Sequence, residues 1–231
     1  YDGNGKSDLA VFDNNTGKWY IKTLDNKLLA WEVPWGWPGA EPVWGDYDGD
    51  GKSDLTVFDQ NTGYWYSLSL SKGPLIWAEP WGWPGAIPVP GDYNGNGKSD
   101  LTVFDNNSGN WFSMTVNKSL IMWAEPWGWP GAITVPGDYD GDDIDDMAVF
   151  DNNTGNWYIL SVAGNGILWA RSWGWPGAIP VPGDYDGNGK SDLAVFDNNT
   201  GNWFILRADG GLIAWALPWG YPSATVVGGR H

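Results

Sequence analysis

Short runs of alternating apolar and polar residues, separated by clusters of Gly, Asn and Asp, fill the chain. Residues 54–59 (DLTVFD), 156–160 (NWYIL) and 75–78 (LIWA) are typical, and short apolar segments such as 86–91 (AIPVPG) precede them. A period of two residues indicates β-strands, and the Gly- and Asn-rich clusters indicate tight turns between antiparallel neighbours. No segment has the period of an amphipathic helix, so the pattern predicts an all-β protein.

The alternating runs belong to a repeat of 46 residues without insertions. One phrase begins at each of five tyrosines, namely Tyr1, Tyr47, Tyr93, Tyr139 and Tyr185. Each unit predicts four short strands, which is the content of a propeller blade. The sequence therefore predicts one domain over 1–231, a five-bladed β-propeller with repeats 1–46, 47–92, 93–138, 139–184 and 185–231. Because 224–229 align with an innermost strand, we expect this C-terminal strand to pair into the N-terminal blade and close the ring.

An acidic loop recurs at the start of the repeats. In GDYDGDGKSDL, residues 45–55, carboxylates stand at positions one, three, five and nine, and glycine stands at position six. The expected ligands there are Asp46, Asp48, Asp50 and Asp54, with the backbone carbonyl of Lys52 at position seven. Alternating oxygen ligands of this kind suit Ca²⁺, which accepts six to eight oxygens in flexible geometry. A plain solvated turn is the alternative, but four uncompensated carboxylates in nine residues would repel one another.

The same spacing extends the expected ligands to the other units. They are Asp92, Asn94, Asn96, Lys98 and Asp100; Asp138, Asp140, Asp142, Ile144 and Asp146; and Asp184, Asp186, Asn188, Lys190 and Asp192. In the first unit Asp2, Asn4 and Asp8 remain, and Arg230 aligns with the missing first ligand. About four to five Ca²⁺ ions are expected, with weaker affinity where amides replace acids. Asp143 stands where the other loops have glycine, which predicts a strained turn.

The phrase PVPGDYDGNGKSDLAVFDNNTGNWFIL, residues 180–206, includes both the loop and its strands, and variants of it cover the whole chain. In these residues the chain resembles the FG-GAP/VCBS repeat family of calcium-loop propellers. The resemblance implies a calcium-stabilised extracellular propeller, secreted or on a cell surface. Some relatives with similar blades are lectins that bind sugars between blades, and others are adhesion modules. The resemblance therefore favours a fold more strongly than a function.

All but one of the 20 tryptophans occur in register with the repeat, the exception being Trp44. Three series are expected to pack within and between blades: Trp19, Trp65, Trp111, Trp157 and Trp203; Trp31, Trp77, Trp123, Trp169 and Trp215; and Trp35, Trp81, Trp127, Trp173 and Trp219. The fourth series lies between Gly and Pro in a tight loop, where we expect the rings to point outward. Its members, Trp37, Trp83, Trp129, Trp175 and Tyr221, are the candidate carbohydrate contacts, with packing against the neighbouring blade as the alternative.

Composition narrows the classes of function that the protein could have. A net charge of −16 argues against nucleic acid as a partner. The chain also lacks an apolar run long enough for membrane insertion. With one His and no Cys, no nucleophilic triad can be assembled, so we expect no enzyme. Two hypotheses remain. One is a calcium-stabilised multivalent lectin that binds glycans or glycoconjugates between its blades. The other is an extracellular structural or adhesion module that binds a protein partner or self-associates through its tryptophans.

Overall fold

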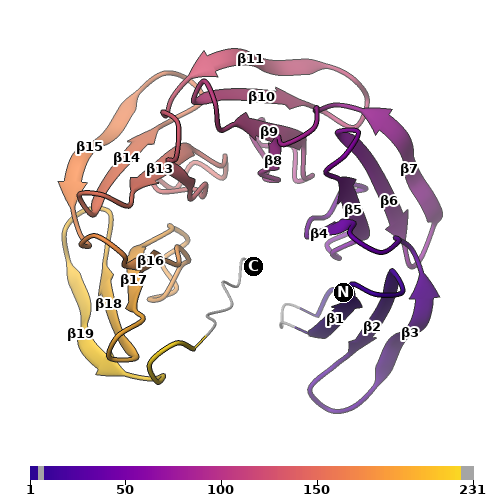
Figure 1. Cartoon of the computed structure of the whole chain (residues 1–231), viewed down its shortest axis with the longest axis horizontal. Helices are drawn as coiled ribbons and strands as arrows, with labels where there is room; N and C mark the ends of the chain where they lie inside the picture. Colours follow the sequence, from indigo (N-terminus) through magenta and orange to yellow (C-terminus); the bar gives the residue numbers. More distant parts are fainter. Residues whose placement is uncertain (5–7, 225–231) are drawn as a thin grey trace.

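The computed structural model describes residues 1–4 and 8–224, which form five antiparallel sheets arranged around a central axis as the blades of a five-bladed β-propeller (Figure 1). The described residues contain no helix, and therefore none long and apolar enough to cross a membrane. Strand order within each sheet follows the sequence. The all-β five-bladed prediction is thus confirmed. The predicted closing strand, 224–229, lies almost wholly outside the described residues.

Each blade runs from an inner strand near the axis to a long strand at the rim (Figure 1). The innermost strands are β4 (Glu41–Val43), β8 (Ile87–Pro88), β12 (Ile133–Thr134) and β16 (Ile179–Pro180). The second strands are β1 (Leu9–Asp13), β5 (Leu55–Asp59), β9 (Leu101–Asp105), β13 (Met147–Asp151) and β17 (Leu193–Asp197). The third strands are β2 (Lys18–Lys22), β6 (Tyr64–Ser69), β10 (Asn110–Met114), β14 (Asn156–Leu160) and β18 (Asn202–Leu206). The rim strands are β3 (Leu28–Pro34), β7 (Gly73–Pro80), β11 (Leu120–Pro126), β15 (Gly166–Ser172) and β19 (Leu212–Pro218).

The hydrophobic core lies between blades. Leu55 and Val57 of the second blade are fully buried against Trp19, Ile21 and Ala30 of the first blade. The later blades repeat this packing in three further apolar clusters. Since one face of each sheet fits the opposite face of its neighbour, the blade pairs stabilise one another by burying apolar surface.

The first blade differs from the others in what it buries. Its sheet has three strands among the described residues, β1 to β3. Leu9 and Val11 on β1 are 49% and 61% exposed, whereas the equivalent Leu55 and Val57 are fully buried. The described part of the fifth blade therefore does not cover the first as the other blades cover their neighbours.

A β-bulge interrupts the pairing of the third and rim strands in every blade. In the second blade the register shifts between Trp65 and Ser67, which leaves Tyr66 out of the ladder. On the facing strand Ala78 adopts the left-handed conformation, with φ 53°. A bulge frees backbone groups and redirects side chains, and here it shapes the rim of the propeller.

Candidate functional site

The acidic loops are organised by the carboxylate at position one. Asp46 accepts the backbone N–H groups of Gly49 and Gly51, each at 2.7 Å. Both glycines have positive φ, 74° and 77°, a conformation that glycine adopts without steric cost. Asp92, Asp138 and Asp184 make equivalent bonds in their own loops. The loop backbone therefore curls around the first carboxylate.

Three of these loops bring carboxylate oxygens together. Within the described residues, oxygens lie within 4.8 Å of one another in three groups: Asp46, Asp48 and Asp50; Asp138, Asp140 and Asp146; and Asp184, Asp186 and Asp192. These are hard oxygen donors, with no nitrogen or sulfur among them, and such a set suits Ca²⁺ better than a transition metal. One oxygen each of Asp146 and Asp192 is buried without a hydrogen-bond partner. A cation bound by the loop would satisfy those oxygens, so the residues fit the metal that the repeat implies.

The carboxylate at position nine is the most deeply buried ligand candidate. One oxygen of Asp54 accepts the N–H of Tyr47 at 2.8 Å, which fixes the loop against the start of β5. Burial, together with the nearby acidic side chains of the loop, raises the pKa of Asp54 to about 6 and that of Asp146 to about 7. The charged form is thus disfavoured without a counter-ion, and a bound cation would reverse that preference.

The loop that begins at Asp92 differs from the other three. The amide of Asn94 donates to both oxygens of Asp100, at 2.9 and 2.7 Å. This contact satisfies the buried carboxylate inside the protein. Together with the second amide at Asn96, it leaves this loop with fewer free charged oxygens than the other three. In the fourth blade Asp143 has φ 63° at position six, so the left-handed turn expected from glycine is made by an aspartate.

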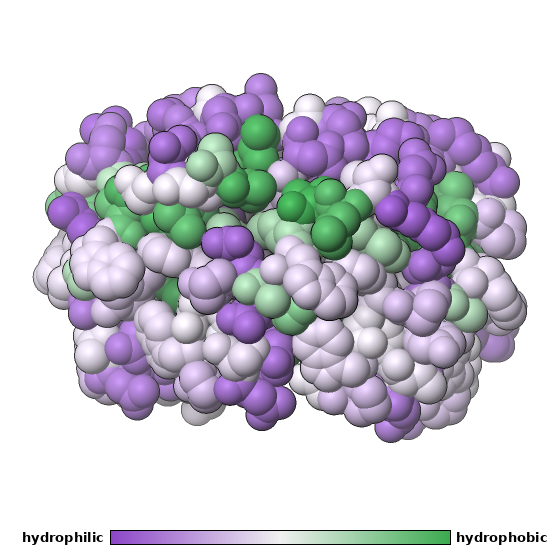
Figure 2. Space-filling view, turned by 90° about the horizontal axis from the view of Figure 1, so that it is seen from above, coloured by the Kyte–Doolittle hydropathy of each residue, from purple (hydrophilic) through white to green (hydrophobic). Residues whose placement is uncertain are grey.

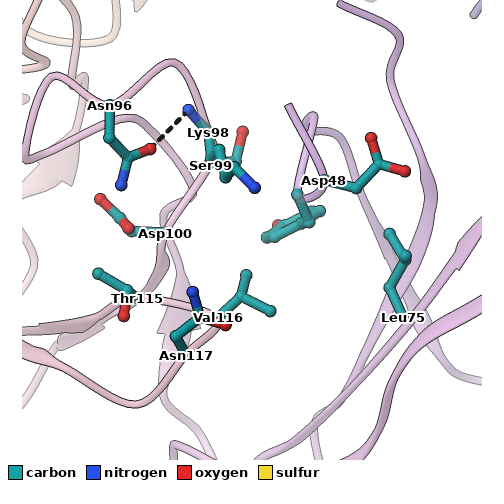
Figure 3. Close-up of a pocket in the computed structure, with 10 residues that line it drawn as sticks. Asp48, Leu75, Asn96, Lys98, Ser99, Asp100, Thr115, Val116 and Asn117 are labelled. Atoms are coloured by element: carbon teal, nitrogen blue, oxygen red, sulfur yellow. Dashed lines mark hydrogen bonds between the residues drawn. The ribbon is translucent and has the colours of Figure 1, made fainter. Parts of the chain in front are cut away.

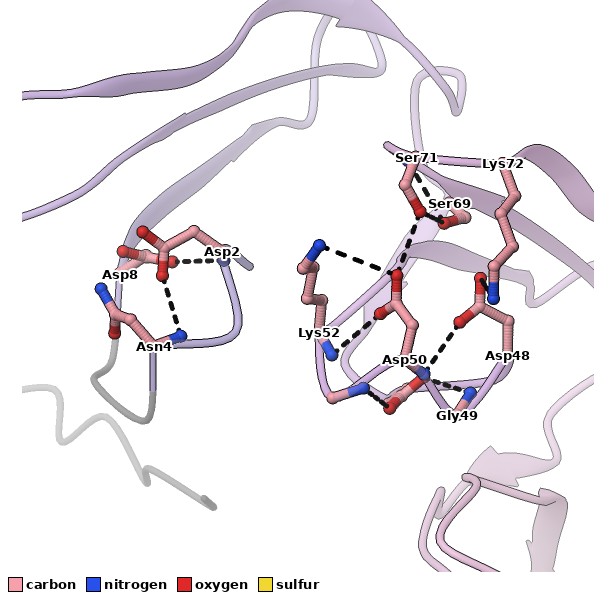
Figure 4. A network of polar contacts seen from close by, with 12 residues as sticks. Asp2, Asn4, Asp8, Asp48, Gly49, Asp50, Lys52, Ser69, Ser71 and Lys72 are labelled. Atoms are coloured by element: carbon pink, nitrogen blue, oxygen red, sulfur yellow. Dashed lines mark hydrogen bonds and ion pairs between the residues drawn. The ribbon is translucent and has the colours of Figure 1, made fainter.

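Cationic side chains neutralise part of the second loop. Lys72 forms an ion pair with Asp48 at 3.0 Å, and Ser71 donates to Asp50 at 3.0 Å (Figure 4).

Figure 4 also shows Asp2, Asn4 and Asp8 side by side in the first blade. There the amino group of Tyr1 lies 2.9 Å from Asp8.

A small pocket opens beside the loops at the junction of two blades. Between the second and third blades it encloses about 200 Å³ and includes Asp48 and Leu75 on one side and Lys98 and Asn117 on the other (Figure 3). A pocket of about 260 Å³ lies at corresponding positions between the first and second blades. The pocket thus recurs with the repeat, and its lining combines loop carboxylates with apolar side chains.

The rim carries a second recurring feature, which is aromatic. The indole N–H of buried Trp65 donates to the carbonyl of Trp81 at 2.6 Å, and this bond anchors the loop that follows the rim strand. The equivalent loop of the first blade carries Trp35 and Trp37. The indole N–H of Trp35 donates across the blade junction to the carbonyl of Tyr66 at 3.3 Å. That carbonyl is available because the bulge removes Tyr66 from the ladder.

Four aromatic rings meet at the junction of the first and second blades, and we call this group the aromatic cluster. In the first cluster, ring centroids of Trp37 and Tyr66 are 5.0 Å apart, those of Tyr66 and Trp77 are 5.6 Å apart, and those of Trp35 and Trp77 are 5.7 Å apart. All three contacts are edge-to-face, a favourable geometry that holds each ring in place. The exposed surface of Trp77 is therefore presented on a rigid support.

The cluster recurs at three more junctions. Its other members are Trp81, Trp83, Phe112 and Trp123; Trp127, Trp129, Tyr158 and Trp169; and Trp173, Trp175, Phe204 and Trp215. The third-strand ring is thus Tyr in two clusters and Phe in the other two. Figure 2, seen from the side of β11, shows a band of hydrophobic residues across this face, with hydrophilic residues above and below it. The clusters lie where adjacent blades meet.

The structure changes the predicted roles of two tryptophan series. The Trp31 series was expected in the core, and this expectation is wrong, because its five members are 64–77% exposed on the rim strands. The bulge at Ala78 and its equivalents changes the phase of the alternation just there. The Trp37 series was expected to point outward, but its four tryptophans are half-buried against the next blade. Tyr221 is 70% exposed, and no described blade follows it.

The remaining predictions for aromatic residues largely hold. Trp19, Trp65, Trp111 and Trp157 are buried, and Trp203 of the last blade is half-buried. Trp35 and its equivalents pack at the junctions as expected, apart from Trp219, which is 79% exposed. Sequence reasoning missed the exposed partner of each cluster. A signal was present, since Trp77 directly follows the buried Ile76, and neighbouring residues of a strand point to opposite faces.

Blades of this construction, with acidic loops at one end and aromatic clusters at the rim, define a β-propeller. Residues 1–57 match the family model of the FG-GAP-like repeat. The predicted FG-GAP-like repeat is thereby confirmed over these residues, and the chain as a whole is a five-bladed propeller. No curated protein gave a match.

Solved structures share the fold at low sequence identity. One is a lectin from Agrocybe aegerita that recognises non-reducing terminal N-acetylglucosamine; it is 18% identical with a TM-score of 0.60, over 94% of this chain and 64% of the lectin. A streptogramin B lyase is 15% identical with a TM-score of 0.59, over 96% of this chain and 68% of the lyase. A protein of unknown function from Bacteroides caccae is 10% identical with a TM-score of 0.55, over 91% and 77%. The chain thus spans less than two thirds of the lectin, and the fold alone serves both binding and catalysis.

Proposed function

We propose that the protein is an extracellular glycan-binding module with repeated sites at its blade junctions. The observation that carries the proposal is the aromatic cluster, in which Trp77 and its equivalents are exposed but held by edge-to-face contacts. An indole face stacks on the apolar C–H face of a pyranose ring. Because the support is formed before the ligand arrives, little conformational entropy is lost on binding.

Polar groups beside the clusters suit hydroxylated ligands. Burial and the nearby carboxylate of Asp59 raise the pKa of the Tyr66 hydroxyl, which keeps this group a neutral donor at the edge of the first cluster. Phe112 takes the same place in the second cluster and lacks the hydroxyl. The four sites therefore share a stacking surface and differ in hydrogen bonding. A shared fold with an N-acetylglucosamine-specific lectin supports a glycan ligand and leaves the sugar undetermined.

Calcium has a structural role in this proposal. The ions would be held by the loop carboxylates, which in the second blade are Asp46, Asp48, Asp50 and Asp54. These carboxylates would supply the negative charge that the ions neutralise. The ions would stabilise the loop end of each blade, because binding only to the folded chain adds to its stability. The glycan contacts lie instead on the rim strands and the loops that follow them.

Multiple sites compensate for weak ones. A single exposed stacking contact gives affinities of the order of millimolar to micromolar, and simultaneous binding to a dense glycan surface multiplies this by about 10² or more. The function proposed is thus adhesion to a glycan-coated surface, with no catalytic step.

The competing function is an adhesion or structural module that binds protein or another copy of itself. The exposed tryptophans at the rim favour it, since exposed apolar surface of this extent also marks protein interfaces. In that case the rim would be covered by a partner chain and would bind no free sugar.

A glycan array in calcium, with two matched variants, tests the proposal. Trp123→Ala removes the exposed ring of the second cluster, whereas Trp31→Ala removes a similarly exposed ring whose one aromatic contact among the described residues is Tyr20 of its own blade. We expect glycan binding by the wild type, weaker binding by Trp123→Ala, and unchanged binding by Trp31→Ala. Folded, calcium-loaded protein that binds no glycan would refute the proposal, and association of the wild type that both variants weaken would favour the competing function.

A further inference from the structure

The acidic loops of adjacent blades are joined directly to each other. The backbone N–H of Asp46, at position one of the second loop, donates to the hydroxyl of Ser99 at 3.0 Å. In return the N–H of Ser99, at position eight of the third loop, donates to the carbonyl of Asp46 at 2.6 Å. We call this pair of bonds the latch. It links the residue that organises one loop to the residue just before Asp100, the buried carboxylate of the next.

The latch recurs at the following junction with a different side chain. The N–H of Asp92 donates to the carboxylate of Asp145 at 2.9 Å, and the N–H of Asp145 donates to the carbonyl of Asp92 at 2.8 Å. At the fourth junction the N–H of Ser191 donates to the carbonyl of Asp138 at 2.5 Å. The backbone half of the latch is therefore common to all three junctions.

Glycine makes room for the latch. A Cβ atom at Gly45 would lie 2.8 Å from the hydroxyl oxygen of Ser99, closer than real side chains approach. Gly45, Gly91 and Gly137 precede position one in their loops. The sequence GD at the start of each motif is thus needed by the neighbouring blade as well as by its own loop.

A second contact reinforces the first. The side chain at position seven of one loop lies over the glycine at position four of the preceding loop, as Lys98 does over Gly49. Ile144 and Lys190 repeat this over Gly95 and Gly141, and the ammonium group of Lys190 donates to the carbonyl of Asp140 at 2.5 Å. The loops therefore stack on one another around the ring.

We propose that Ser99, Asp145 and Ser191 are positioning residues for the cation loop of the preceding blade and couple cation binding between neighbouring loops. The proposal rests on the calcium binding included in the proposed function. A cation that fixes Asp46 also restrains the latch and, through Ser99, the adjacent carboxylate of Asp100. The next cation then binds a loop that is already partly ordered, which is positive cooperativity.

Two substitutions of the same residue type separate the latch from the loop itself. Ser99→Ala removes the side-chain acceptor of the latch. Ser53→Ala removes the equivalent hydroxyl of the second loop, which makes no such bond to another loop within the described part of the chain. Ser99→Thr retains the hydroxyl and serves as the rescue variant. Each is titrated with Ca²⁺ by calorimetry, and exchange of backbone amides is followed by mass spectrometry.

The loops have different sequences, so exchange reports on each one separately: 47–54 reads YDGDGKSD and 93–100 reads YNGNGKSD. We expect Ser99→Ala to weaken Ca²⁺ binding about fivefold or more, in the range of typical coupling between sites. It should also speed amide exchange in 47–54, with and without calcium. Ser53→Ala and Ser99→Thr should resemble the wild type.

Removing one cation site tests the coupling itself. Asp100→Asn weakens the third loop without touching the second, and we expect it to raise the Ca²⁺ concentration at which 47–54 becomes protected from exchange. Equal behaviour of Ser99→Ala and Ser53→Ala, or protection of 47–54 that is independent of Asp100, would overturn the proposal. Absence of any calcium binding by the wild type would instead refute the calcium component of the proposed function, and faster exchange in Ser99→Ala without calcium would still show that the latch positions the loop.

Discussion

Two glycines of the third blade, Gly109 and Gly131, allow the packing behind the aromatic cluster to be measured. Both are left-handed, with φ 78° and 84°. A Cβ atom at Gly131 would meet nothing within 4 Å, whereas one at Gly109 would lie 2.5 Å from the backbone nitrogen of Trp129. Alanine at either position incurs the same conformational strain, and only at Gly109 must the loop that carries Trp129 also move.

The magnitudes follow from these two terms. Left-handed alanine costs about 1–2 kcal/mol, so Gly131→Ala should lose that amount of stability. Gly109→Ala should lose a further amount of about 1–3 kcal/mol, the typical cost of overpacking, and should also shift Trp129 away from Tyr158. Urea unfolding at a fixed calcium concentration, followed by tryptophan fluorescence, measures both free energies of unfolding. Equal losses for the two variants would refute the close approach of the turn to this loop.

Three further predictions concern the loops and the core. Burial raises the pKa of Asp100 to about 7, so the cation-free fold binds more protons than the unfolded chain. The melting temperature of the calcium-free protein should therefore fall as the pH rises from about 4 to 7, and stabilisation by Ca²⁺ should grow over the same rise. A melting temperature that does not change with pH in the absence of calcium would contradict this. Asn94→Asp should strengthen Ca²⁺ binding about tenfold by calorimetry, because it restores a charged ligand and removes the amide bonds to Asp100; unchanged affinity would argue against that ligand set. Thr102→Ala should cost about 1–3 kcal/mol in urea unfolding by leaving the buried hydroxyl of Ser113, now 2.7 Å away, without its partner; the double variant Thr102→Ala with Ser113→Ile, the pair found in the fourth blade, should recover most of the loss.

The fold was predictable because its signals are local and repeated. Alternation with period two and turns rich in Gly and Asn define each strand, and five copies of one unit define the architecture. The acidic loop was predictable for the same reason, since its carboxylates lie within nine consecutive residues such as 46–54. Local spacing suffices where every contributing residue comes from one loop.

Features that depend on two blades were harder to predict. The bulge at Tyr66 interrupts the alternation of the rim strand between Ile76 and Glu79, and Trp77 in this stretch is 73% exposed. The partners of Trp37 lie about 30 residues further along, in the next blade. The latch joins Asp46 to Ser99, and no spacing within one repeat reveals that contact. Sequence repetition shows that a junction recurs but does not show which residues meet across it.

The stoichiometry of glycan binding tests the central claim most directly. The described residues form four aromatic clusters, so calorimetry of the calcium-loaded protein with its best monovalent glycan should give about four sites. Trp123→Ala should leave about three, and Trp31→Ala should retain all four. A stoichiometry that Trp123→Ala does not reduce would contradict the account by placing the glycan away from the blade junctions.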